Sequence, residues 1–154
     1  MTLAAFRFHK GGAIQYAMNH NAYTEVTWPC TEYNYGGGTR TGNKWIVPGE
    51  GPRILSTEAC VWMPNYVRHD GYQNLCLKFT RNGGDMFAVV GSAAYGASAP
   101  NSGTNFASGS DYVEEGDEIC VISHVLSISG YPDVYADGNP AHTWWSGVLL
   151  PLPC

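Results

Sequence analysis

Apolar positions are densest near the end of the chain, in residues 142–151. Aromatic, β-branched and aliphatic residues follow one another almost without interruption there, and Pro151, which cannot donate a hydrogen bond to a neighbouring strand, closes the run. This pattern predicts a β-strand. Because apolar residues occupy both of its alternating faces, we expect the strand to lie in the middle of a sheet and to tie the end of the chain into the core.

Two other long segments, residues 53–63 and 118–128, alternate as β-strands do. In the second segment both faces are largely apolar, whereas a two-layer sandwich exposes one face of each strand to water. We therefore expect one face of residues 118–128 to contact another subunit. The side chains on that face are Cys120, Ile122, His124, Leu126 and Ile128.

Shorter segments complete an all-β pattern. Alternation predicts further strands at residues 4–9, 23–28, 44–47, 74–80 and 86–91, and residues 13–17 make a short additional piece. Glycine and small polar residues predict loops at 31–43 and 93–110. No segment longer than a turn or two has the helical period. These strands, about ten in all, predict a sandwich or jelly roll in a single domain, residues 1–154.

Composition and charge narrow the classes of function. Charged residues make up 14% of the chain, against about 25% in a typical soluble domain, so much of the surface must be uncharged or covered by other subunits. The net charge of −5 argues against nucleic acid and anionic membranes as partners. No apolar run is long enough to span a membrane, and the first residues lack the pattern of a signal peptide. We therefore expect a protein made in a cytosol and not secreted by that route.

The chemically reactive residues form no recognisable catalytic or zinc-binding pattern. The five cysteines are widely spaced, and we expect free thiols, with Cys154 as the one that could reach a neighbouring chain. No nucleophile elbow, P-loop or dinucleotide-binding motif occurs. We therefore do not expect an enzyme.

Five short motifs, in order along nearly the whole chain, resemble the globular head of the complement C1q/tumour necrosis factor superfamily. They are Ala5-Phe6, Gly42-x-x-Trp45-x-x-Pro48-x-x-Gly51, Leu77 to Gly83, Val113-x-x-Gly116-Asp117-x-Ile119 and Trp145-Ser146-Gly147-Val148-Leu149-Leu150. The resemblance implies a jelly roll of about ten strands that forms tight trimers. It gives the role of fold signature to Phe6, Trp45, Pro48, Gly51, Gly116, Asp117, Trp145 and Gly147.

A trimer gives the apolar face of residues 118–128 a partner. Trp145 takes the place of a phenylalanine in the family, so we expect it inside the protein. Its neighbour Trp144 must then point to the opposite face, where it lies either in the trimer contact or on the surface. His124 lies on the predicted contact face. A hydrogen-bonded histidine without a switching role is favoured there over one whose protonation loosens the trimer.

Two acidic segments raise the question of calcium, which some C1q-like heads bind. They are residues 114–118, with four carboxylates around Gly116, and Asp133-x-x-x-Asp137-Gly138-Asn139. Contiguous carboxylates on a turn seldom converge on one ion, and the second segment lacks the full calcium-loop pattern. Solvated turns are the favoured interpretation, so we expect no cofactor, with calcium as the alternative.

The function that best fits a cytosolic trimeric head is a structural role in a virus particle. We expect a capsid decoration (cement) protein or a head spike of a bacteriophage, located on the virion surface, with capsid or other virion proteins as partners. The alternative is a receptor-binding or adhesion head that recognises a glycan or a host protein through the loops at 93–110 and 36–42. A secreted C1q-like ligand is a third class.

Overall fold

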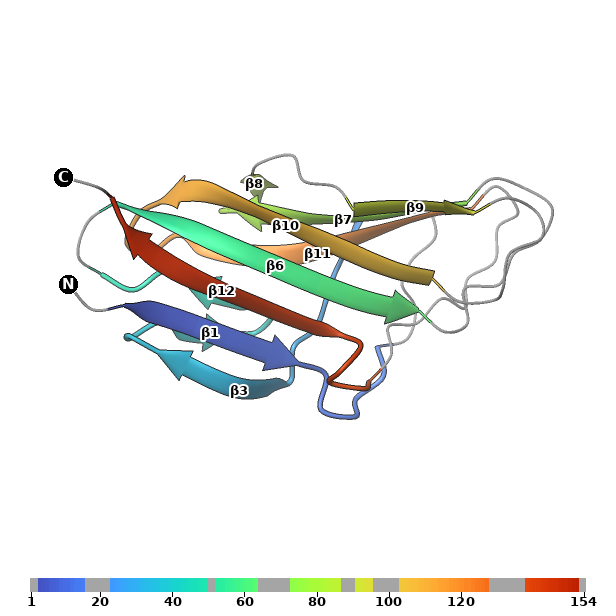
Figure 1. Cartoon of the computed structure of the whole chain (residues 1–154), viewed down its shortest axis with the longest axis horizontal. Coiled ribbons are helices and arrows are strands. Elements are labelled where there is room, and N and C mark those ends of the chain that lie inside the picture. Colours follow the sequence, from blue (N-terminus) through green and yellow to red (C-terminus); the bar gives the residue numbers. More distant parts are fainter. Residues whose placement is uncertain are drawn as a thin grey trace.

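The protein is a sandwich of two antiparallel β-sheets (Figure 1). The computed structural model describes residues 3–15, 23–49, 52–63, 73–86, 91–95, 103–127 and 138–152. These residues form twelve strands and no helix. Within this part of the chain, then, there is no helix that could cross a lipid bilayer.

The first sheet has five strands in the order β10-β6-β12-β1-β3. Their bounds are Ala4–His9 for β1, Cys30–Tyr35 for β3, Arg53–Met63 for β6, Gly103–Val113 for β10 and Trp144–Pro151 for β12. The last strand is therefore flanked by β6 and β1, which confirms the prediction that the end of the chain lies in the middle of a sheet.

The second sheet is centred on β11 and β7. The order of its main path is β4-β5-β11-β7-β8, β2 also pairs with β11, and β9 also pairs with β7. The bounds are Tyr23–Glu25 for β2, Thr39–Thr41 for β4, Lys44–Ile46 for β5, Gln73–Arg81 for β7, Gly84–Asp85 for β8, Gly91–Tyr95 for β9 and Glu118–Ser127 for β11.

The core lies between the sheets and is built around aromatic rings. Phe6 contacts Trp45 of the opposite sheet and Trp145 of the neighbouring strand, with ring centroids 4.4 and 4.9 Å apart. All three side chains are fully buried. Gly147 makes room for Phe6, since a Cβ at that position would lie 2.7 Å from the phenylalanine ring. Four of the predicted signature residues therefore meet in one place.

The other signature residues form turns. Gly116 has φ of +83°, a conformation that favours glycine. Asp117 follows it, and its carboxylate accepts hydrogen bonds from the backbone N–H of Glu114 at 2.9 Å and from Asn82 Nδ2 at 2.7 Å. This pairing ties the turn before β11 to the turn after β7. Pro48 is half-buried, and Gly51 lies outside the described residues.

The structure corrects two predicted loops. Of the loop expected at 93–110, residues 93–95 belong to β9 and residues 103–110 to β10, and the expected loop at 31–43 contains most of β3 and all of β4. Along β10, buried Ala107 alternates with exposed Phe106 and Ser108. Because the inward side chain is small, the alternation does not stand out as a hydrophobic pattern.

Two predicted strands also have different bounds. The strand expected at 23–28 ends at Glu25. Beyond it, the backbone N–H of Val26 donates a hydrogen bond to the carbonyl of Val121 at 2.9 Å. Of the strand expected at 86–91, Met86 follows β8 outside any strand, Gly91 is the first residue of β9, and residues 87–90 lie outside the described part of the chain.

Replacing Gly147 by valine is expected to lower the free energy of unfolding by about 1–3 kcal/mol, because the new side chain would collide with Phe6 and Leu55 inside a packed core. Chemical denaturation of both proteins measures the difference. Gly84→Ala is the matched control, since a Cβ there meets nothing closer than 3.5 Å. Equal stability of Gly147→Val and wild type would contradict this packing.

Candidate functional site

The outer face of the five-stranded sheet is the most apolar exposed surface among the described residues. Large exposed apolar side chains on this face are Leu3, directly before β1, and Tyr35, Phe106, Tyr112 and Leu150 on its strands. Isolated exposed apolar residues are normal, whereas several on one sheet face mark an interaction surface.

Cross-strand pairing orders this face into rows. At one end Tyr112, Ile54 and Leu150 lie side by side on β10, β6 and β12. At the other end the corresponding row is Phe106, Cys60 and Trp144. The two rows between them are mostly polar, so apolar groups lie at both ends of the sheet and flank a polar centre.

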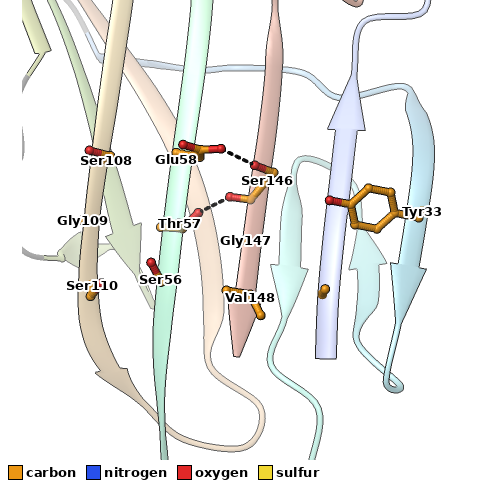
Figure 2. Close-up of a pocket in the computed structure, with 11 residues that line it drawn as sticks. Tyr33, Ser56, Thr57, Glu58, Ser108, Gly109, Ser110, Ser146, Gly147 and Val148 are labelled. Atoms are coloured by element: carbon orange, nitrogen blue, oxygen red, sulfur yellow. Dashed lines mark hydrogen bonds between the residues drawn. The ribbon is translucent and has the colours of Figure 1, made fainter. Parts of the chain in front are cut away.

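The polar centre is a hollow of about 440 Å³. Figure 2 shows Glu58 on β6 between Ser108 of β10 and Ser146 of β12. Ser146 Oγ donates a hydrogen bond to the Glu58 carboxylate at 3.2 Å. The lining residues are Ala5, Tyr33, Ser56, Thr57, Glu58, Ser108, Gly109, Ser110, Ser146, Gly147 and Val148. Because most of them are small, the backbone of the sheet is approachable here.

Thr57 fastens the floor of the hollow. Its hydroxyl donates to the carbonyl of Ser146 at 2.7 Å and accepts a hydrogen bond from the indole N–H of Trp145 at 2.9 Å. Both bonds are buried. They satisfy the one polar atom of the Trp145 side chain and hold β6 to β12 from the core side.

An aromatic cluster lies at the Trp144 end of the face. The guanidinium of Arg7 stacks over the Trp144 ring at 4.9 Å, and Phe106 meets the same ring edge-on at 6.3 Å. Arg7 Nε also forms an ion pair with Glu32 at 3.0 Å. The cation is therefore already paired, and the aromatic rings are the groups that remain for a partner.

The outer face of the seven-stranded sheet has a different chemistry. Lys78 forms an ion pair with Asp85 at 2.6 Å and lies over the ring of Tyr23 at 4.1 Å. Lys44 is paired with Glu118 at 2.5 Å. Charged pairs of this kind are typical of a surface in contact with water.

The predicted trimer-contact residues are divided between the two outer faces. Cys120, Ile122 and His124 lie on β11, whereas Trp144 lies on β12 in the other sheet. Since the outer faces of a sandwich point in opposite directions, one flat contact does not include both groups. The side chain of Leu126 and the whole of Ile128 lie outside the described residues. The contact itself stays a prediction.

Cys120 and His124 have partners within the chain. Cys120 is 3% exposed, and burial raises the pKa of its thiol to about 12. The His124 ring packs against Tyr23 with centroids 4.7 Å apart. Sequence reasoning missed Tyr35 and Phe106 as surface groups of the five-stranded sheet. The signal was present as period-two spacing of Tyr33 with Tyr35.

The acidic turn before β11 uses its carboxylates locally. Both oxygens of Asp117 accept hydrogen bonds, and Glu114 Oε1 accepts one from the Tyr112 hydroxyl at 3.1 Å. In the described ranges no group of three or more His, Cys, Asp or Glu side chains is placed to hold a metal ion. Asp133 and Asp137 lie outside those ranges.

Comparison with solved structures identifies the fold. The crystal structure of murine APRIL at pH 8.5 superposes with a TM-score of 0.63 and 15% identity, covering 97% of this chain and 100% of that one. The structure of Eiger TNF from S. frugiperda gives a TM-score of 0.60 and 17% identity, covering 97% and 94%. The fold is therefore the TNF-like jelly roll. No family model and no curated protein matches the sequence.

Replacing Thr57 by valine is expected to destabilise the protein by about 1–3 kcal/mol, because the buried indole N–H of Trp145 loses its acceptor while the shape of the side chain is kept. Urea denaturation gives the difference. Ser110→Ala, which removes an exposed hydroxyl from the same hollow, is the control and should change stability little. A Thr57→Val protein as stable as wild type would show that this bond contributes nothing.

Proposed function

We propose that the chain is a non-catalytic, homotrimeric TNF-like head that decorates the surface of a virus particle, as a capsid cement protein or head spike of a bacteriophage. The observation that carries the first part of this proposal is the set of exposed apolar side chains on the outer face of the five-stranded sheet. The virion role rests on the fold and on composition.

The contact surface we propose is this outer face. Phe106, Tyr112 and Leu150 are 47%, 39% and 42% exposed, and each lies in a row with further apolar groups on neighbouring strands. Burying such a surface in a closed, symmetric oligomer removes it from water. The outer face of β11, with its lysine and carboxylate pairs, is the weaker candidate.

A structural role on a capsid agrees with the character of the remaining surface. The low content of charged residues and the net charge of −5 disfavour a nucleic-acid partner. A trimer fits the three-fold positions of an icosahedral shell. This step is an argument from fold and symmetry, so its test must be a direct one.

Recognition of a glycan or a host protein is the second candidate. Of its predicted loop at 93–110, residues 93–95 belong to β9 and residues 103–110 to β10, and residues 96–102 lie outside the described part of the chain. Of its predicted loop at 36–42, residues 39–41 form β4 and the turn at 36–38 remains. Beside this turn Tyr33 and Tyr35 stack with centroids 5.6 Å apart. Tyr35 is exposed and Tyr33 is half-buried, and such a stacked pair next to a glycine-rich turn is a suitable platform for a sugar or a protein loop.

Light scattering on the purified protein is expected to give three times the chain mass of 16.7 kDa. Leu150→Glu or Phe106→Glu should shift the mass towards one chain, because each places a charge in the proposed contact. Tyr23→Glu is the control, since Tyr23 is 59% exposed on the other sheet and should leave the trimer intact. Dissociation by Tyr23→Glu alone would move the contact to the β11 face.

If the trimer is a cement protein, it should co-sediment with capsids that lack it and raise the temperature at which they release their contents. Leu150→Glu should lose both effects along with the trimer. A stable trimer that ignores capsids but is retained by a defined sugar on a glycan array would favour the recognition head. A monomeric wild type would overturn the shared premise.

A further inference from the structure

Lys10, directly after β1, has its whole side chain inside the protein. It is 0% exposed, although lysine is among the residues least often buried without a charged partner. It continues the inward-facing positions of β1, after Phe6 and Phe8, and belongs to the largest fully buried side chains of the described residues. Neither the core packing nor the proposed contact face needs an amine here.

The amine is held by a closed network of neutral groups. Lys10 Nζ donates to Gln15 Oε1 at 2.6 Å and to Thr27 Oγ1 at 2.7 Å. Gln15 Oε1 also accepts from the backbone N–H of Thr27 at 2.7 Å, and Gln15 Nε2 donates to the carbonyl of Glu25 at 2.7 Å. The network therefore joins the turn after β1 to the segment that follows β2.

A second contact holds the same turn. The N–H of Gly12 donates to the carbonyl of Gly138 at 2.7 Å, and the close fit leaves no space for a Cβ on Gly138. Gly138 belongs to the segment that leads into β12. The turn at Gly11 and Gly12 is thus the place where β1, the segment after β2 and the entry to the central strand are connected.

The network suits an uncharged amine. A neutral amine has two N–H donors, and two acceptors are present, whereas an ammonium has three. Titratable residues in the surrounding elements are His9, Glu25 and Cys30, and within the described residues none of them forms a hydrogen bond or ion pair with the amine through its side chain. Burial alone lowers the pKa of Lys10 from 10.5 to about 7.

We propose that Lys10, Gln15 and Thr27 form a proton-operated latch, in which the uncharged amine holds the turn after β1 closed and protonation of the amine opens it. Opening lets the ammonium reach water and frees the turn from both the segment after β2 and Gly138. The device is independent of the trimer and of any virion role, and it makes the order of this end of the sandwich depend on pH.

The direction follows from proton binding. In the open state Lys10 has its ordinary pKa of 10.5, and in the closed state a pKa of about 7. Between these two pH values the open state binds more protons than the closed state. The closed state is therefore increasingly favoured over the open state as the pH rises from 7 towards 10.5. Below pH 7 both states are protonated, and the preference for opening is at its largest and nearly constant.

Amide hydrogen exchange tests the latch at the residues it holds. Between pH 7 and pH 8.5, after correction for the intrinsic exchange rate, the opening constant reported by the amides of Gly12 and Thr27 should fall roughly fifteenfold in the wild type. In Lys10→Met it should not change with pH. Lys78→Met, which removes a lysine paired with Asp85 on the surface, is the control and should behave as the wild type does.

Either of two results would overturn the proposal: exchange in the wild type that is independent of pH in this range, or the same dependence in Lys10→Met. Should Lys10→Met fail to fold, the wild type labelled with ¹³C at lysine Cε decides the matter. A resonance of folded protein titrating near pH 7 supports the latch. If every lysine resonance titrates near pH 10.5, the latch is excluded.

Discussion

The packing of Phe6 between Trp45 and Trp145 holds the two sheets together. The three rings come from β1, β5 and β12, which are far apart in the sequence, and they meet at centroid distances below 5 Å. Two glycines make the approach possible: Gly147 faces the Phe6 ring, and a Cβ on Gly38 would lie 2.4 Å from Trp45 Nε1. Because the large aromatic rings pack against glycine backbone that carries no side chain, the two sheets can approach closely while each ring buries most of its surface.

This core fixes which groups face outwards. Once Trp145 points inwards, Trp144 and Ser146 must point to the outer face, and the same alternation places Glu58 and the serines of β10 beside them. The apolar ends and polar centre of that face are therefore consequences of the core register. The two outer faces differ in emphasis: two lysine–carboxylate pairs lie on the seven-stranded sheet, whereas tyrosine, leucine and phenylalanine side chains gather exposed on the five-stranded sheet.

Strands with large apolar residues were predictable from the sequence. The strand at 53–63, the described part (118–127) of the strand expected at 118–128, and the central place of the last strand are confirmed, since Leu55, Val61 and Val121 mark the inward face plainly. The strand β10 was missed because its inward positions carry Ala107 and Gly109, whose small size gives no hydrophobic signal. Likewise β3 is an edge strand of mostly polar residues. Its pairing with β1, rather than a hydrophobic pattern of its own, places it in the sheet.

The contact face and the buried lysine required the fold. A strand that is apolar on both sides indicates a covered face, but the sequence alone does not tell which sheet the strand joins or what its neighbours contribute. On β11 Tyr23 packs against His124, and Lys78 lies over the Tyr23 ring and brings charge to this face. Lys10 looks like an ordinary surface residue in the sequence. Only its position after β1, facing the same side as Phe8, brings the amine into the interior.

The first and last strands of the chain, β1 and β12, lie side by side, and this has a practical consequence. Ala4 is paired with Leu149, and both chain ends leave the sandwich at the same end (Figure 1). A short peptide could therefore join them into a ring, and the two-residue turn at exposed Gly42 and half-buried Asn43 could be opened to give new ends. In such a circular permutant the strands would follow one another along the chain in a different order, with β12 leading directly into β1. Every strand would keep its pairing partners in the two sheets.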